Sequence, residues 1–142
     1  MRPATKLRLA GAAALAAGLA LLPAATASNR GPATLKIAER DFRIKAPKQL
    51  RAGEFELVVH NQGPNAHELI VVHGGPRDLP LRSDGLTVDE KALEKREVAA
   101  FEPGEGGTTR RVRVHLAPGR YVLFCNMSGH YLGGMRSILL VH

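Results

Sequence analysis

Two segments far apart in the chain alternate apolar and polar residues with a period of two. In GEFELVVHNQG, the apolar residues Phe55, Leu57 and Val59 face one way and Glu54, Glu56 and His60 the other, and TTRRVRVHL repeats the pattern. This period is typical of β-strands that bury one face. HELIVVHGG is a continuous apolar run that predicts a more buried strand, and RYVLFC and RSILLVH predict two more. Several short strands separated by turn residues favour an all-β sandwich or barrel.

The interval between the central strands breaks this pattern. Residues 74–107 are mostly polar and show no regular strand period. Within them, LTVDEKALEKREVAA is rich in good helix formers. We therefore expect a long insertion that holds a short helix.

The N-terminal segment has the three parts of a secretory signal peptide. Arg2, Lys6 and Arg8 precede an uncharged run over residues 9–22, and Ala-Thr-Ala at 25–27 supplies a small-residue cleavage pattern. A permanent transmembrane helix needs about 20 apolar residues, which this run lacks. We expect 1–27 to be a signal peptide and 28–142 to be one exported domain, periplasmic or extracellular, without stable membrane insertion.

The charge balance is informative mainly through what it excludes. The formal net charge of +7 falls to +4 when Arg2, Lys6 and Arg8 are removed with the signal. The remaining basic residues lack the interleaved aromatic residues of a nucleic-acid surface. We expect no nucleic-acid partner, although a basic face can steer an acidic protein partner.

The single cysteine cannot form an internal disulfide, and an unpaired thiol in an oxidising compartment needs burial or a bound partner. Near the C-terminus, YVLFCNMSGHYLGGMRSILLVH brings Cys125, His130 and Met135 into one short segment. Thiolate and thioether are soft ligands and imidazole is borderline, so together they suit copper better than calcium or magnesium. A set of two His and one Cys with a weak axial Met describes an electron-transfer copper site.

The second histidine of such a set must come from elsewhere in the chain. His60 and His115 fall on the polar sides of their strands, and His142 is the C-terminal residue. His67 stands where a turn becomes a buried strand, whereas His73 lies at the other end of that strand, about 20 Å away. His67 is therefore the predicted partner of the C-terminal segment.

NQGPNAHELIVV followed by GRYVLFCNMSGHYLGGMRSILLVH resembles the cupredoxins, the family of small blue copper proteins. The Cys-x4-His-x4-Met loop is similar to that of the rusticyanin-like members. The resemblance implies a Greek-key β-sandwich with one type 1 copper ion at one end, held by His67, Cys125, His130 and Met135. It also implies that electrons leave through His130.

Two positions depart from the family pattern. Glu68 follows the first predicted ligand, where many members have an Asn or Ser that supports the site through hydrogen bonds. Ser128 stands where related loops often have Pro, which could loosen the loop. Gly133 and Gly134 are expected to be turn residues and nothing more.

The function that these features favour is a one-electron carrier cycling between Cu(II) and Cu(I), acting as a monomer with redox partner proteins. Met127, Tyr131 and Leu132 either form an apolar docking patch for such a partner or simply cover the metal, and the sequence leaves both interpretations open. A periplasmic copper carrier or resistance protein is the alternative function. The small number of Met and Cys residues makes it the weaker one.

Other interpretations explain less of the pattern. A multicopper oxidase or copper nitrite reductase needs more copper-binding histidines, and no His-x-His occurs. A Cys125–His130 nucleophile pair is conceivable, but it leaves His67 and Met135 without a role, so we predict that the protein is not an enzyme. Zinc also binds Cys and His, although a Met ligand argues for copper. Taken singly, a buried Cys, a core Met and a structural His are all ordinary.

Overall fold

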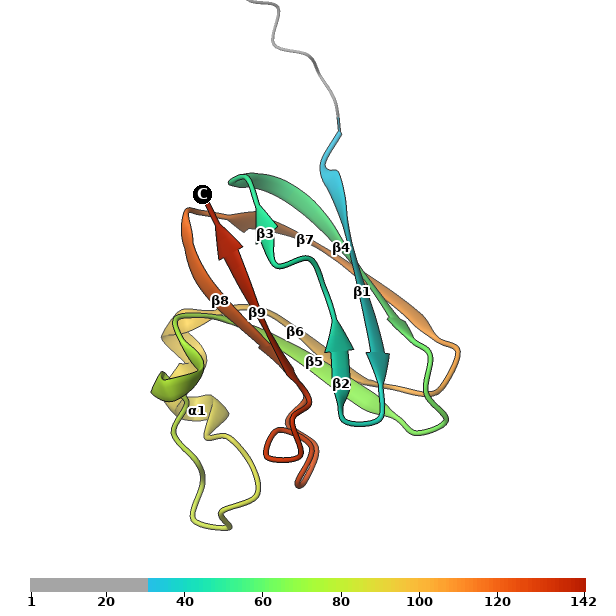
Figure 1. The fold of residues 1–142 in the computed structure, drawn as a ribbon, viewed down its shortest axis with the longest axis vertical. Helices are drawn as coiled ribbons and strands as arrows, with labels where there is room; N and C mark the ends of the chain where they lie inside the picture. The colour runs from blue at the N-terminus through green and yellow to red at the C-terminus, as the bar shows by residue number, and fades with distance from the viewer. Residues whose placement is uncertain (1–30) are drawn as a thin grey trace, which may run out of the picture.

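The computed structural model describes residues 31–142, which form two β-sheets packed face to face (Figure 1). The first sheet has the strand order β2-β1-β4-β7 and the second the order β3-β9-β8-β5-β6. The strands are β1 (Ala33–Arg40), β2 (Arg43–Lys45), β3 (Gln49–Leu50), β4 (Gly53–Asn61), β5 (His67–His73), β6 (Glu97–Gly104), β7 (Thr109–Leu116), β8 (Gly119–Phe124) and β9 (Arg136–Val141). The predicted all-β sandwich is confirmed.

Most neighbouring strands are antiparallel, with two exceptions. β1 runs parallel to β4, and the short β3 runs parallel to β9. The parallel register places Glu39 beside Asn61, so the turn that follows β1 and the turn that follows β4 lie at the same end of the sandwich. The predicted alternation of Phe55, Leu57 and Val59 is present, and all three side chains are buried between the sheets.

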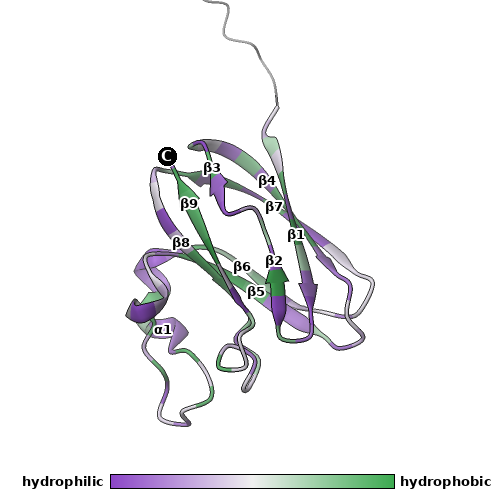
Figure 2. Cartoon of the chain, in the orientation of Figure 1, coloured by the Kyte–Doolittle hydropathy of each residue, from purple (hydrophilic) through white to green (hydrophobic). Residues whose placement is uncertain are grey.

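A second apolar cluster covers the outer face of the β5 sheet. Leu79, Val88 and Leu93, which come from the segment between β5 and β6, pack there against Val72 and Phe124. This segment also holds the 3-10 helices η1 (Pro76–Asp78) and η2 (Glu94–Arg96) and the single-turn helix α1 (Glu90–Leu93). β5 is thus buried on both faces, which explains its continuous apolar run. In Figure 2, α1 is mostly hydrophilic and β9 mostly hydrophobic.

The structure differs from the expectations at two places, the 74–107 segment and Val112. Residues 74–107 are not all insertion, because β6 (Glu97–Gly104) is a full strand that pairs with β5 at the edge of the sheet. Val112, predicted to be buried with Val114 and Leu116, is 37% exposed. The predicted signal peptide, residues 1–27, lies outside the described residues. Within residues 31–142, no helix is long and apolar enough to cross a bilayer.

Candidate metal centre

Three predicted ligands meet at one end of the sandwich. His67 is the first residue of β5, Cys125 directly follows β8, and His130 lies in the loop between β8 and β9. One ring nitrogen of each histidine and the Cys125 sulfur lie within 4.8 Å of one another. The His130 Nδ1 is 3.5 Å from the Cys125 Sγ, and the centroids of the two imidazole rings are 5.2 Å apart.

Met135 closes the loop that carries Cys125 and His130. Its carbonyl accepts a hydrogen bond from the Cys125 N–H (3.1 Å), and its own N–H donates to the His130 carbonyl (2.9 Å). The side chain is fully buried in the same core cluster as Cys125. The loop therefore begins and ends at residues whose backbones bond to each other.

Backbone conformation explains the glycines of this loop. Gly129 and Gly134 adopt φ values of 77° and 99°, a region that side-chain-bearing residues rarely occupy. Gly133 does more than turn the chain, because a Cβ there would lie 2.4 Å from the Phe42 ring. The loop is attached to the β5–β6 segment next to Ser128, because the Gly129 N–H donates to the Leu86 carbonyl (3.2 Å).

Burial dominates the electrostatics of the site. It raises the pKa of the Cys125 thiol to about 11, although hydrogen bonds from the backbone N–H groups of Met127 and Glu68 favour the thiolate. Burial, followed by the proximity of His67, lowers the pKa of His130. Without a metal ion, Cys125 is therefore a protonated, inert thiol at neutral pH, which argues against the nucleophile interpretation.

One polar atom at the centre shows that the residues fit a metal ion. The Nδ1 of His67 is buried and has no hydrogen-bond partner, while its Nε2 is 3.0 Å from the Asp41 Oδ1. Buried nitrogens are rarely left unpaired without a functional reason. Two imidazoles, a thiolate and a thioether are the donor set of copper electron-transfer sites.

The remaining histidines do not join this group. His60 faces outward from β4 and bonds to Thr108 and Thr109. His73 packs edge-on against Tyr121 at the other end of β5. His115 pairs with the exposed Glu54 on the outer face of the first sheet. Within residues 31–142, the one cluster of metal-ligating His, Cys, Asp and Glu side chains is His67, Cys125 and His130.

Two residues that the sequence did not point to touch the site, and both lie in the turn between β1 and β2. Asp41 contacts His67, and the Phe42 ring lies 5.2 Å from the His130 ring. Phe42 is a turn residue and 53% exposed. No sequence signal links this turn to residues so distant in the chain.

Glu68, which directly follows His67, bonds to the backbone of the loop that carries Cys125. Its carboxylate accepts a hydrogen bond from the Asn126 backbone, and burial and the neighbouring Glu90 raise its pKa. The contact to the Nε2 of His67 comes instead from Asp41.

Tyr131 is one of the three residues that the sequence left open as either a docking patch or a cover over the metal. It is only 6% exposed, packs against Phe124, and donates a hydrogen bond to the Pro76 carbonyl. Leu132 is 47% exposed and Met127 is half-buried. Tyr131 therefore belongs to the core beneath the loop, and the exposed apolar residues near His130 include Leu132 and Phe42.

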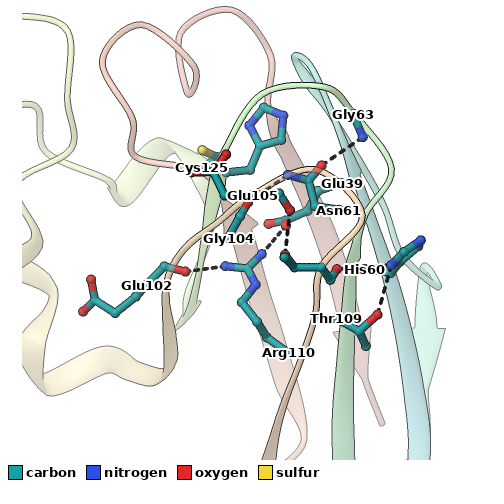
Figure 3. Close-up of polar contacts among 12 residues, drawn as sticks. Glu39, His60, Asn61, Gly63, Glu102, Gly104, Glu105, Thr109, Arg110 and Cys125 are labelled. Atoms are coloured by element: carbon teal, nitrogen blue, oxygen red, sulfur yellow. Dashed lines mark hydrogen bonds and ion pairs between the residues drawn. The ribbon is translucent and has the colours of Figure 1, made fainter.

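Asn61 holds the turn that leads into His67 (Figure 3). Its amide Nδ2 donates to the carbonyls of Asn65 (2.7 Å) and Gly104 (2.9 Å), and its Oδ1 accepts from the Gly63 N–H (2.9 Å). Asn61 is fully buried. These bonds tie the β4–β5 turn to the end of β6 and so fix the start of β5.

A buried ion pair lies beside this turn (Figure 3). Arg110 of β7 donates to the Glu39 Oε2 of β1 and to the Glu102 carbonyl of β6, so it joins the two sheets along one side. Glu39 is fully buried, and its Oε1 has no partner. Burial raises the pKa of Glu39 from its ordinary value of 4.5 to about 7, although the charge of Arg110 and its hydrogen bond lower this pKa.

This pKa predicts that the metal-free protein loses stability as pH rises from about 4.5 to 7. Over that window the folded state holds a proton on Glu39 that the unfolded state has released. At about 1.36 kcal/mol per pKa unit, the loss from this group is about 3 kcal/mol. Urea unfolding at pH 5 and pH 8 should show Glu39→Gln lacking this decrease and the exposed-site variant Glu105→Gln retaining it. A Glu39→Gln variant with the wild-type pH dependence would contradict the prediction.

Several solved structures are similar to this one in fold. An auracyanin of Roseiflexus castenholzii matches with a TM-score of 0.63 and 23% identity, covering 79% of this chain and 99% of that one. Auracyanin A of Chloroflexus aurantiacus, a "blue" copper protein, matches with a TM-score of 0.60 and 23% identity, covering 79% and 100%. Rusticyanin of Thiobacillus ferrooxidans matches with a TM-score of 0.57 and 14% identity, covering 79% of each.

No protein-family model and no curated protein sequence matches this chain. The structural matches cover 79% of this chain, which is nearly all of the described residues. The expected resemblance is thus confirmed at the level of the fold. The chain has the cupredoxin fold.

Proposed function

We propose that this protein is a one-electron carrier that binds a single type 1 copper ion through His67, Cys125, His130 and Met135. The observation that carries the proposal is the cluster of two imidazoles and one thiol within 4.8 Å, with the Nδ1 of His67 buried and unpaired. The similar auracyanin A is a blue copper protein, which supports the same chemistry here.

The bound ion would supply the Cu(II)/Cu(I) couple. The residues of the chain would exclude water from the ion and restrain the positions of its ligands. Cys125, Met135 and His67 are fully buried, which excludes water from three of the four proposed ligands. The closed loop and the strand that begins at His67 restrain the ligands in both oxidation states. Limited rearrangement on gain or loss of an electron favours fast transfer.

His130 is the proposed route for the electron. It is the one partly exposed member of the four, and Leu132 and Phe42 lie exposed near it. A redox partner docking on these apolar side chains would come close to the His130 ring. Met127, Tyr131 and Leu132 were open to two interpretations, a docking patch or a cover over the metal, and burial of Tyr131 favours the second for that residue.

Electron transfer is favoured over enzymatic catalysis and over copper delivery. The proposed ligands enclose the site, and no second metal-ligating cluster occurs within residues 31–142. The mature chain has only Met127 and Met135 and one Cys, which is few for a protein that hands copper on. The N-terminal pattern of residues 1–27 supports export to the periplasm or beyond.

Titration of the purified domain with Cu(II) tests the proposal. We expect one equivalent to bind and to produce an intense visible charge-transfer band that a mild reductant bleaches and an oxidant restores. A colourless protein would contradict the copper assignment. A coloured protein that rapidly loses Cu(I) to a modest chelator would favour copper delivery instead.

A further inference from the structure

We propose that Asp41 is a positioning residue that fixes the tautomer and orientation of His67, so that the β1–β2 turn is part of the metal centre. The expected effects on copper binding rest on the proposed function, whereas the contact between Asp41 and His67 does not depend on it.

The contact between the two side chains determines which nitrogen of His67 is available. The Asp41 Oδ1 lies 3.0 Å from the Nε2 of His67. An ionised carboxylate only accepts hydrogen bonds, so Nε2 carries the proton and Nδ1 keeps a free lone pair. That Nδ1 is buried and has no partner. Asp41 therefore leaves His67 in the tautomer that presents Nδ1 to a metal ion.

Asp41 is itself held in position. The Asn65 side-chain amide donates to its Oδ2 (2.7 Å), and Asn65 is tied in turn to Asn61 through its carbonyl. Gly63 allows the close approach, because a Cβ there would lie 2.9 Å from the Asp41 Oδ1. With both carboxylate oxygens engaged, the direction of the bond to His67 is set before any metal binds.

The neighbouring residue brings the same turn against the second histidine. Phe42 adopts a φ of 58°, which is unusual for a bulky residue, and its ring contacts His130 at 5.2 Å between centroids. The ring also occupies the space left open by Gly133. Left-handed backbone in a non-glycine residue is unfavourable and persists where surrounding contacts enforce it. Two consecutive residues of one turn thus touch both proposed copper histidines.

A carboxylate that accepts the remote N–H makes an imidazole a stronger donor. The added negative charge favours Cu(II) over Cu(I), so Asp41 should lower the reduction potential. Loss of such a partner typically weakens metal binding by about 10–100-fold. A tenfold loss confined to Cu(II) corresponds to a potential about 59 mV higher for a one-electron couple.

The test compares Asp41→Asn and Asp41→Ala with the wild-type protein. Glu54→Gln is the matched control, because Glu54 also pairs with a histidine, His115, but on an exposed surface away from the site. Nitrogen-15 NMR of the metal-free proteins reports the His67 tautomer. Competition titration reports Cu(II) affinity, and voltammetry reports the potential.

We expect Nε2-protonated His67 in the wild-type and Glu54→Gln proteins, and a mixture of tautomers in Asp41→Ala. Both Asp41 variants should bind Cu(II) about 10–100-fold more weakly and show a higher potential. Asn65→Ala, which removes only the support of Asp41, should shift each measurement in the same direction by less. It also serves as the second test if Asp41→Ala does not fold.

Unchanged tautomer, affinity and potential in the Asp41 variants would overturn the inference while leaving the proposed function intact. If the wild-type protein does not bind Cu(II), the proposed function fails. The metal-free NMR comparison then still decides whether Asp41 positions His67.

Discussion

We expect the Cys125→Ser variant, after addition of Cu(II), to lack the intense visible band of the wild-type protein. The band of such a site arises from charge transfer between the thiolate and copper, and a hydroxyl group is not a soft ligand. Cys125 is fully buried, with its sulfur 3.5 Å from the His130 Nδ1. The expected result is complete loss of the band, measured by absorption spectroscopy at equal copper and protein concentrations.

The control for this experiment is His115→Ala, which removes an exposed histidine from the outer face of the first sheet. It should retain the full band, because His115 lies outside the ligand cluster. Circular dichroism should show that Cys125→Ser keeps the β-sandwich, since serine is smaller than cysteine and the backbone bond to Met135 remains. A band of wild-type intensity in Cys125→Ser would exclude Cys125 as the copper ligand.

A large loss of stability is expected for Asn126→Ala. The Asn126 Oδ1 accepts from the Val88 N–H (2.6 Å), and its Nδ2 donates to the Val88 carbonyl (3.0 Å) and to Glu90 (2.6 Å). Val88 is fully buried, so alanine at position 126 leaves a buried N–H and C=O unpaired. At about 1–3 kcal/mol for each unpaired group, the free energy of unfolding should fall by about 3 kcal/mol.

The measurement is urea unfolding of the metal-free protein at a fixed pH. Ser128→Ala, an exposed change in the same loop, should alter stability by less than about 0.5 kcal/mol. A loss below about 1 kcal/mol for Asn126→Ala would mean that water replaces the lost bonds. In that case, Asn126 does not anchor the β5–β6 segment to the metal loop.

Local patterns were sufficient to predict the central strands and the C-terminal loop. The alternation in β4 depends on one buried face, and the continuous apolar run of β5 on two. β6 was missed because EVAAFEPG contains a proline and exposed polar residues, which an edge strand tolerates. Its identity as a strand depends on pairing with β5, which no window of the sequence contains.

In the candidate site, too, some features were evident from the sequence and others only from the tertiary structure. The sequence by itself determined the spacing of Cys125, His130 and Met135, because one short loop carries them and its glycines allow it to close. Only the tertiary structure brought Asp41 to His67, 26 residues along the chain. The physical reason is the parallel pairing of β1 with β4, which places the turns after both strands at the metal end. A long-range contact of this kind follows from strand register, which residue types near Asp41 do not encode.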